Sequence, residues 1–307
     1  MTVIYKKVAL IGLGLIAGSI AHAIRRGGLA ETISGTARSA ETRDIARKIN
    51  LCDVICDTAA EAVKDADLVI LAVPVGAMAA VAAEIEPHLK AGATLSDVGS
   101  VKAAVIKNVS PFVPDGVHFI PAHPIAGSEK SGPHSGFATL FDNRWCILVP
   151  VPGTDADALD KISGFWKSLG SNVEVMDAQH HDLVLAMTSH APHLIAYTMV
   201  GVADDLSRVT DKEVINFSAA GFRDFTRIAA SDPTMWRDVF LNNKEATLEI
   251  LGRFTEELFD LQRAIRGGDG DFLHDYFTRT RAIRRGIIEA GQDTDEPDFG
   301  RGLTKES

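Results

Sequence analysis

The stretch KVALIGLGLIAGSIAHAIRRGG, residues 7–28, decides the fold of the first half of this 307-residue chain. Its apolar beginning, residues 7–11, is typical of a buried β-strand, and residues 16–26 have the apolar spacing of a helix. Gly27 and Gly28 would end that helix, because glycine readily adopts the left-handed conformation found after helix C-termini. The stretch therefore predicts a strand, a tight turn and a helix, the opening unit of a Rossmann-type fold.

The turn itself, GLGLIAG at residues 12–18, has the glycine spacing of a phosphate-binding loop. Gly12 would permit the tight turn, Gly14 would let the backbone approach a pyrophosphate, and Ala17 would allow close packing of helix on strand. The first turn of the helix would offer unpaired N–H groups to the phosphates. We therefore expect five residues to bind a dinucleotide cofactor here: Gly12, Gly14, Leu15, Ile16 and Ala17.

The end of the second predicted strand, SGTARS at residues 34–39, bears on which dinucleotide binds. An acid at this place would bond the ribose 2′-hydroxyl of NAD, but Ala37 stands there. A 2′-phosphate could instead be received by Thr36, Arg38 and Ser39. This pattern favours NADP over NAD. At the end of a later strand, in LAVPV at residues 71–75, Val73 and Pro74 are expected near the nicotinamide.

Short apolar runs alternate with helical stretches up to residue 177. Strands are expected at residues 7–11, 32–36, 53–56, 67–73, 94–97, 118–121, 146–149 and 173–176, and helices at 16–26, 40–49, 59–64 and 75–85. Such alternation predicts a parallel sheet with right-handed crossovers. Residues 1–177 are therefore expected to form an α/β dinucleotide-binding domain.

The pattern changes after residue 177. Helical segments are expected at residues 178–202, 212–217, 234–266 and 270–288, which predicts an all-α second domain over residues 178–290. The polar tail, residues 291–307, is rich in glycine and aspartate and is expected to be disordered.

The composition suits an ordinary enzyme, with 46% hydrophobic and 23% charged residues. A net charge of −10 makes the chain a poor general binder of nucleic acid or of anionic membranes. Three cysteines imply no disulfide framework and indicate a reducing compartment. Polar residues and glycines interrupt the apolar N-terminus, and no uninterrupted apolar run reaches the ~20 residues of a membrane span. We therefore expect a cytoplasmic protein.

Four further segments carry potential chemistry: DVGSVK (97–102), PAHPIAGSEKSG (121–132), TSHAPHLIAY (188–197) and AAGFRDFTRIAASDPTMWRD (219–238). The first two follow predicted strands, at the sheet edge where ligands bind in open α/β folds. With these four segments in this order, from about residue 7 to about residue 266, the chain resembles the prephenate, arogenate and cyclohexadienyl dehydrogenases.

This resemblance implies a Rossmann domain, a helical dimerisation domain and therefore a homodimer. It also implies an NAD(P)-dependent oxidoreductase of tyrosine biosynthesis. Hydride leaves C4 of prephenate and the ring carboxylate leaves as CO2, giving 4-hydroxyphenylpyruvate; arogenate would give tyrosine. Aromatisation drives this reaction, so orientation and one positioned proton acceptor matter more than a strong base.

The family motifs match site residues in this chain. His123 matches the catalytic histidine, which would accept the 4-hydroxyl proton. Ser100 matches a serine that bonds the same hydroxyl or orients the histidine, although it could also be the N-cap of a helix. Arg227 matches the substrate-binding arginine, and it should hold the side-chain carboxylate, since a tight grip on the departing carboxylate would slow its loss. Further positions that match residues near the substrate are His193, Arg223, Asp224 and Trp236.

The sequence also allows other interpretations of its function. Another two-domain dehydrogenase, of the β-hydroxyacid type, is the main alternative, but the lysine that such enzymes use on their helical domain is not recognisable here. His190 and His193 have the spacing of a metal pair, yet no carboxylate partner pattern accompanies them, so we expect no metal. The sequence does not decide between prephenate and arogenate, nor whether tyrosine inhibits at the active site.

Overall fold

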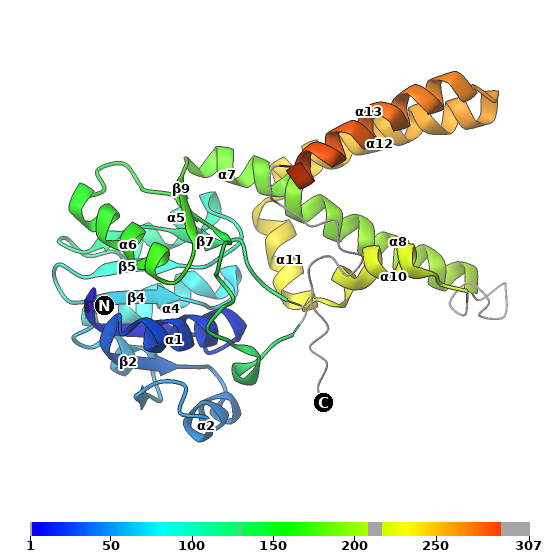
Figure 1. Cartoon of the computed structure of the whole chain (residues 1–307). Helices are drawn as coiled ribbons and strands as arrows, with labels where there is room; N and C mark the ends of the chain where they lie inside the picture. Colours follow the sequence, from blue (N-terminus) through cyan, green and yellow to red (C-terminus); the bar gives the residue numbers. More distant parts are fainter. Residues whose placement is uncertain (1, 129, 208–216, 290–307) are drawn as a thin grey trace. The chain divides into compact units, whose positions relative to one another are not determined.

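The computed structural model describes residues 2–128, 130–207 and 217–289 (Figure 1). The chain forms two compact units, Met1–Leu248 and Glu249–Ser307. The first unit contains the β-sheets and the helices up to α11, and with them every residue expected in the site. The second contains most of α12 (Lys244–Gly267) and all of α13 (Gly270–Glu289).

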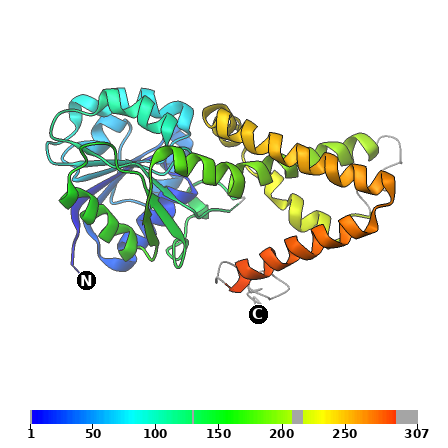
Figure 2. The same cartoon turned by 90° about the horizontal axis from the view of Figure 1, so that it is seen from above.

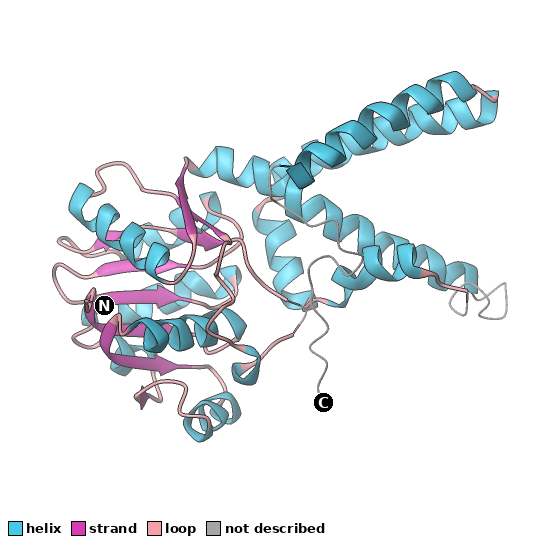
Figure 3. Cartoon of the chain, viewed as in Figure 1, coloured by secondary structure: helices cyan, strands magenta, loops and turns pink. Residues whose placement is uncertain are grey.

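Six parallel strands form the main sheet in the order β3-β2-β1-β4-β5-β6 (Figure 3). They are β1 (Tyr5–Ile11), β2 (Ala30–Thr36), β3 (Val54–Ile55), β4 (Leu68–Leu71), β5 (Thr94–Asp97) and β6 (His118–Phe119). The strand order reverses between β1 and β4, so the carboxyl ends of these two strands flank the crevice where open α/β sheets bind ligands. The predicted Rossmann-type fold is confirmed.

Helices cover both faces of this sheet. They are α1 (Leu15–Gly27), α2 (Ala40–Lys48), α3 (Ala59–Val63), α4 (Met78–Ile85), α5 (Ala103–Val109) and α6 (Ala156–Ser168). In β1, Val8 and Leu10 pack into one apolar cluster with α1 and α6, whereas Ala9 and Ile11 pack into the other with α3, α4 and α5. Figure 2 shows α1 and α6 on one face and α4 and α5 on the other. Burial on both faces explains the near-continuous apolar strands.

Three later strands form a separate sheet: β7 (Ala122–Pro124), β8 (Trp145–Leu148) and β9 (Asn172–Val175). The expectation that they extend the parallel sheet is wrong, because β7 and β8 are antiparallel. The predicted strand at 118–121 ends early, as β6 at His118–Phe119, and β7 begins only after Pro121. Pro121 has no N–H to continue the β6 ladder, and its carbonyl accepts instead from Val149 at 2.9 Å.

The predicted helix at 178–202 is present but interrupted. It consists of α7 (Ala178–Leu185), a π-helical turn (Ala186–His190) and α8 (Ala191–Ser207). The Ala191 N–H donates to the Ala186 carbonyl, five residues back. Pro192 cannot donate to the carbonyl four residues before it, so a widened turn suits this place. π turns often mark functional sites.

The following helices are α10 (Ala220–Thr226), a 3₁₀ turn (Arg227–Ala230), α11 (Pro233–Asn242) and then α12. The predicted single helix at 234–266 is broken at Asn243, whose side chain bonds groups on α7 and the π turn. The helix α10 was not predicted. The helix expected at 212–217 lies outside the described residues except for Phe217, which is in a turn, and the tail expected to be disordered lies outside them entirely.

One continuous helical stretch, Ala178–Leu206, is long and apolar enough to pass a membrane-span criterion based on length and hydropathy alone. Its described side chains include His181, His190 and His193, all hydrogen-bonded within the first unit. We therefore interpret it as part of the folded unit and of its site.

Candidate active site

The turn after β1 is built for close backbone approach. Gly12 has φ of 99°, and a Cβ there would lie 2.4 Å from the Ala72 carbonyl oxygen, so only glycine fits. Gly14 is the N-cap of α1, and no side chain caps this helix. The first helical hydrogen bond runs from the Gly18 N–H to the Gly14 carbonyl. The N–H groups before it have no partner within the helix: those of Leu15, Ile16 and Ala17. Together they fit a pyrophosphate.

The segment that follows β4 lies between this turn and a helix of the same unit, α11. Val73 lies beside Gly12, with its Cγ1 3.0 Å from the position of a Cβ on that glycine. Pro74 is exposed and precedes the 3₁₀ turn Val75–Ala77. A Cβ on Gly76 would lie 2.8 Å from Oδ2 of Asp238 on α11. The carboxyl edge of the sheet and α11 therefore meet at close range.

The side chains expected to bind the 2′-phosphate of NADP differ in exposure. Thr36 is 5% exposed, and its hydroxyl donates to the Cys56 carbonyl at 2.9 Å. Arg38 and Ser39 are exposed. The Ser39 hydroxyl accepts from the Thr42 N–H at 3.1 Å and so caps α2. Thr36 is thus engaged inside the protein, while Arg38 and Ser39 face solvent at the expected place.

A second cation stands beside this loop and was not predicted from the sequence. Arg43 donates to the carbonyls of Ala37 at 2.7 Å and Arg38 at 3.1 Å, and it pairs with Asp57 at 3.3 Å. The signal available in the sequence was a basic residue in the first turns of the helix after β2. Arg43 shapes the loop and adds positive charge next to it.

His123 lies in β7 and is 8% exposed. Its Nδ1 is 2.9 Å from Nε2 of His181 on α7, and Nδ1 of His181 is 2.8 Å from Oδ1 of Asp182. The three side chains form one hydrogen-bonded chain from a carboxylate to the predicted catalytic imidazole.

The order of donors in this chain fixes the tautomers. An ionised carboxylate only accepts, so His181 carries its proton on Nδ1 and leaves Nε2 as an acceptor. His123 must then donate from Nδ1, which leaves its own Nε2 with a free electron pair. His123 is thereby held in the form that a proton acceptor requires.

Asp182 is itself held in place by α5. Its Oδ1 accepts from the Lys102 N–H at 2.7 Å, and its Oδ2 accepts from the Ala103 N–H at 3.0 Å. Asp182 therefore caps α5, and the alternative in which Ser100 caps it is wrong. Sequence reasoning missed His181 and Asp182, although a His-Asp pair within an apolar helix was an available signal.

Burial shifts the histidines toward their neutral forms. It lowers the pKa of His123 well below its ordinary value, and the neighbouring His181 and Lys102 act in the same direction. Burial also lowers the pKa of His181, against the effect of Asp182. Both imidazoles are therefore neutral at neutral pH, in agreement with the tautomers deduced from the hydrogen bonds.

The expected substrate-binding residues form a second group. The His193 ring stacks on Trp236 with centroids 3.8 Å apart and an interplanar angle of 26°. Nδ1 of His193 donates to the Ser189 carbonyl at 2.8 Å, so its Nε2 is the ring nitrogen left for a ligand. Burial lowers the pKa of His193, and the Arg227 guanidinium adds to this. His193, Trp236 and Arg227 are thus brought together.

His190 and Asn243 connect the two groups. The Asn243 amide donates to the Asp182 backbone carbonyl at 2.8 Å and to Nδ1 of His190 at 3.1 Å. The His190 ring lies edge-on to Trp236. Burial lowers the pKa of His190 to about 4, against a smaller effect of the Ser100 backbone, which places Ser100 beside this cluster.

Arg223 and Asp224 are exposed residues of α10, about one turn before Arg227. The helix packs against α8, and the Tyr197 hydroxyl of α8 donates to the Ser231 carbonyl at 2.8 Å. The arrangement places all the expected substrate residues on α8, α10, α11 and the turn between them.

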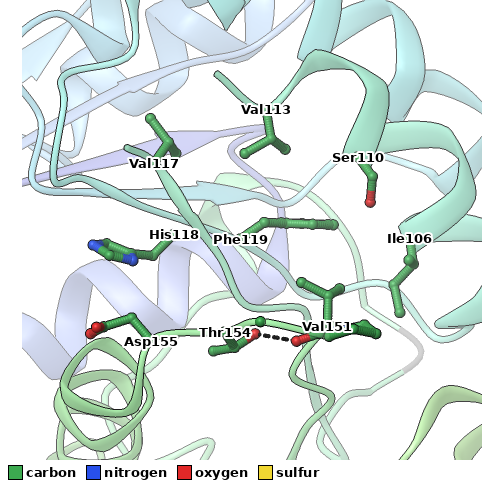
Figure 4. A pocket seen from close by; sticks show the side chains of 11 residues that line it. Ile106, Ser110, Val113, Val117, His118, Phe119, Val151, Thr154 and Asp155 are labelled. Atoms are coloured by element: carbon green, nitrogen blue, oxygen red, sulfur yellow. Dashed lines mark hydrogen bonds between the residues drawn. The ribbon is translucent and has the colours of Figure 1, made fainter. Parts of the chain in front are cut away.

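A surface cavity lies away from these residues (Figure 4). It has a volume of about 440 Å³ and is lined by residues at the start of β6 and by the segments before it and after β8. None of the expected site residues lines it, so it does not bear on the chemistry. Within the described ranges, no group of three or more His, Cys, Asp or Glu side chains is arranged to hold a metal ion.

Comparison with known proteins agrees with this geometry. Residues 20–175 match the nucleotide-binding domain of prephenate dehydrogenase, and residues 177–279 match its dimerisation domain. The chain is 42% identical to a cyclohexadienyl dehydrogenase of Zymomonas mobilis over 92% of this chain and 96% of that one. It is 33% identical to a prephenate dehydrogenase of Bacillus subtilis over 91% of this chain and 76% of that one.

Solved structures give the same result. Prephenate dehydrogenase from Aquifex aeolicus, in complex with hydroxyphenyl propionate and NAD+, superimposes with a TM-score of 0.85 at 31% identity, covering 92% of this chain and 98% of that one. Arogenate dehydrogenase from Synechocystis gives a TM-score of 0.76 at 26% identity, covering 92% and 99%. The chain therefore belongs to the prephenate dehydrogenase family of NAD(P)-dependent oxidoreductases.

Proposed function

We propose that this chain catalyses the oxidative decarboxylation of prephenate to 4-hydroxyphenylpyruvate, of arogenate to tyrosine, or of both. The observation that carries the proposal is the hydrogen-bonded chain Asp182–His181–His123, which leaves Nε2 of His123 as a proton acceptor. The relatives support it, since a prephenate dehydrogenase and an arogenate dehydrogenase are among them. The β-hydroxyacid type of dehydrogenase is not favoured by the matches.

His123 would accept the proton of the substrate 4-hydroxyl as the C4–H bond breaks. The bound NAD(P)+ supplies the hydride acceptor. The ring carboxylate then leaves as CO2, and its electron pair completes the aromatic ring. The proton held on His123 can return to the phenolate oxygen, so the side chain ends the cycle neutral. Ser100, beside His190, would bond the same hydroxyl.

Arg227 would hold the side-chain carboxylate, with His193 and Trp236 forming the wall against which the substrate lies. An ion pair to the departing carboxylate would stabilise charge that the transition state loses, so the cation belongs at the other carboxylate. Arg223 and Asp224 would support this end of the site from α10. Both prephenate and arogenate keep the side-chain carboxylate, so this grip does not separate them.

We further propose that NADP is preferred over NAD. No acid stands at Ala37, while Arg38 is exposed at the end of β2 and Arg43 adds a second positive charge. Arg38→Ala should raise the KM for NADP about tenfold or more, by loss of one charge-assisted hydrogen bond. The KM for NAD should stay within twofold. If both cofactors weaken equally, Arg38 does not read the 2′-phosphate.

We also propose a cytoplasmic homodimer, with the domain division at residue 177. The second unit exposes large apolar side chains that a partner subunit would cover: Leu258, Phe259, Ile265, Phe272, Phe277 and Ile283. The family match over residues 177–279 is to a dimerisation domain, which supports a symmetric helical interface. A monomer in light scattering at micromolar concentration would contradict the dimer.

Steady-state kinetics with prephenate and arogenate, each crossed against NAD and NADP, tests the proposal directly. Substrate-dependent reduction of the cofactor with release of CO2 is the expected result. Inclusion of tyrosine at fixed substrate would show whether it competes for the site. Activity with neither substrate, but with a β-hydroxyacid, would overturn the assignment.

A further inference from the structure

We propose that the buried pair Asp97–Lys102 is a positioning device for His123. The inference rests on the proposed role of His123 and deepens it. Both side chains are fully buried, and they bond each other directly. Asp97 ends β5 and Lys102 directly precedes α5. They bound the segment DVGSVK, which was expected near the site, but the sequence assigned a role there only to Ser100.

The pair holds both polar backbone groups of Ala122, the residue directly before His123. The Lys102 ammonium donates to the Ala122 carbonyl at 2.7 Å. The Ala122 N–H donates to Oδ1 of Asp97 at 3.3 Å. Oδ2 of Asp97, which bonds Lys102, also accepts from the Gly99 N–H at 2.7 Å. The peptide groups that orient the His123 backbone are therefore held by two charged groups from a neighbouring strand and helix.

Lys102 also acts on the far end of the histidine chain. Its backbone N–H donates to Oδ1 of Asp182, the same oxygen that accepts from His181. Lys102 thus holds Ala122, the residue before His123, with its side chain. With its backbone N–H it holds Asp182, the carboxylate at the other end of the hydrogen-bonded chain. A shift of Lys102 would move both ends of the Asp182–His181–His123 chain together.

The energetic cost of the pair indicates a role beyond stability. Burial raises the pKa of the Asp97 carboxyl and lowers that of the Lys102 ammonium, against the favourable effect of each on the other. Buried ion pairs are often replaceable by apolar side chains without loss of stability. Several charged and titratable groups surround His123 besides this pair: His181 and Asp182 from α7, His190 from the π turn and Cys146 from β8.

The test is a double-mutant cycle between positions 102 and 123. Lys102→Met keeps the length of the side chain and removes its donors to Ala122 and Asp97. It should lower kcat roughly 10–10²-fold, as expected for a small misplacement of a catalytic group, with the KM for the dinucleotide within twofold. In the His123→Asn background the same change should have almost no further effect on kcat. Equal losses in both backgrounds would overturn the proposal.

Two variants control for folding. Ser96→Ala removes another buried side-chain bond from β5, to the Ile120 carbonyl at 2.6 Å, and should leave kcat near wild type. Asp97→Asn/Lys102→Met removes both charges, while the amide oxygen introduced at position 97 can still accept from the Ala122 N–H. This double variant should fold and still lose kcat, because the Ala122 carbonyl has lost its donor. Wild-type kcat in the folded double variant would contradict the proposal.

A readout independent of turnover separates this inference from the proposed function. In protein with ¹⁵N-labelled histidine, the imidazole shifts of His123, assigned with the His123→Asn variant, should show a proton on Nδ1 only. Lys102→Met should give a mixture of tautomers, and Ser96→Ala should not. If His123→Asn keeps full kcat, the proposed function fails, while the tautomer measurement still decides the positioning. An unchanged His123 spectrum in Lys102→Met would overturn the positioning.

Discussion

The two functional regions of the first unit differ in how firmly they are built. The proton-handling region, His123 with His181 and Asp182, is buried, and each of its three side chains is hydrogen-bonded to the next. The carboxylate-holding region, on α8, the short helix α10 and the turn after it, has exposed or half-buried cations. The first is preorganised, and the second is open to solvent.

This difference follows from what each region must do. A proton acceptor needs one tautomer and one direction, and a chain of buried hydrogen bonds supplies both without reorganisation during the reaction. A carboxylate that enters and leaves needs a cation accessible from solvent. The contrast predicts that changes in the first region act on kcat and that changes in the second act on KM.

The largest expected effect comes from His123→Asn. The amide is polar and of similar reach but cannot accept a proton in the same way. It should lower kcat by about 10²–10⁴, the range for loss of a general base, with little change in KM. Initial rates against substrate concentration measure both. His118→Asn is the matched control, because His118 lies in β6 and lines the surface cavity that contains none of the expected site residues. Full kcat in His123→Asn would refute the mechanism.

Much of the fold was readable from local sequence, because its signals are local. The turn at Gly12 needs a left-handed backbone and has no room for a side chain, so its glycine can be recognised without knowing any partner. The alternation of strands and helices up to residue 97 likewise follows from the burial of β1 and β4 on both faces. The register of later strands depended on Pro121 and was not foreseen.

The site was only partly readable, because its support comes from distant segments. His123, Arg227 and Trp236 stand in motifs that resemble a known family. Asp182 and Asn243 stand in none of these motifs, and their roles arise only when α7 meets α5 and the α11–α12 junction meets the π turn. Residues 234–266 have helical periodicity throughout, yet the helix breaks at Asn243, where the side chain makes tertiary hydrogen bonds. No pattern within these residues indicated the break, because its cause lies in distant segments.

The buried region should also make the protein acid-sensitive. The pKa of His190 falls from 6.5 to about 4 on folding. Between pH 6.5 and pH 4, His190 is therefore protonated in the unfolded chain and neutral in the folded chain. Because the unfolded chain binds more protons, the free energy of unfolding falls as the pH is lowered, by about 3 kcal/mol at pH 4 for this group. Histidines 123, 181 and 193 act in the same direction.

Chemical denaturation between pH 7 and pH 4.5 measures this loss. His190→Gln, which can still accept from Asn243, should weaken the pH dependence by about one proton. His274→Gln, which replaces an exposed histidine of α13, is the matched control. A stability that stays constant from pH 7 to pH 4.5 would contradict the buried neutral histidines.

In the carboxylate-holding region, Arg227→Ala should raise the KM for prephenate and arogenate roughly 10–10²-fold, since a charge-assisted bond contributes about 1.5–3 kcal/mol. Values of kcat should change less than fivefold, because the grip is made in ground and transition states alike. Arg47→Ala, which removes an exposed cation at α2, is the control. If KM is unchanged, the carboxylate is held elsewhere, and Arg223 is the next candidate.

The smallest expected effect, and the sharpest test of the comparison, comes from replacing one acid in each region. Asp182→Asn replaces the carboxylate that fixes the tautomer of His181 with an amide that can also donate. His123 is one residue further along the chain, so the loss should be attenuated to about tenfold in kcat, well below that of replacing His123 itself. The acidic limb of kcat/KM should also move, because the field of the carboxylate is gone. Asp224→Asn removes an exposed acid of α10 from the carboxylate-holding region and should act on KM, with kcat and the pH profile as in the wild type. Equal effects of the two substitutions on kcat would mean that the hydrogen-bonded chain behind His123 does not govern proton transfer.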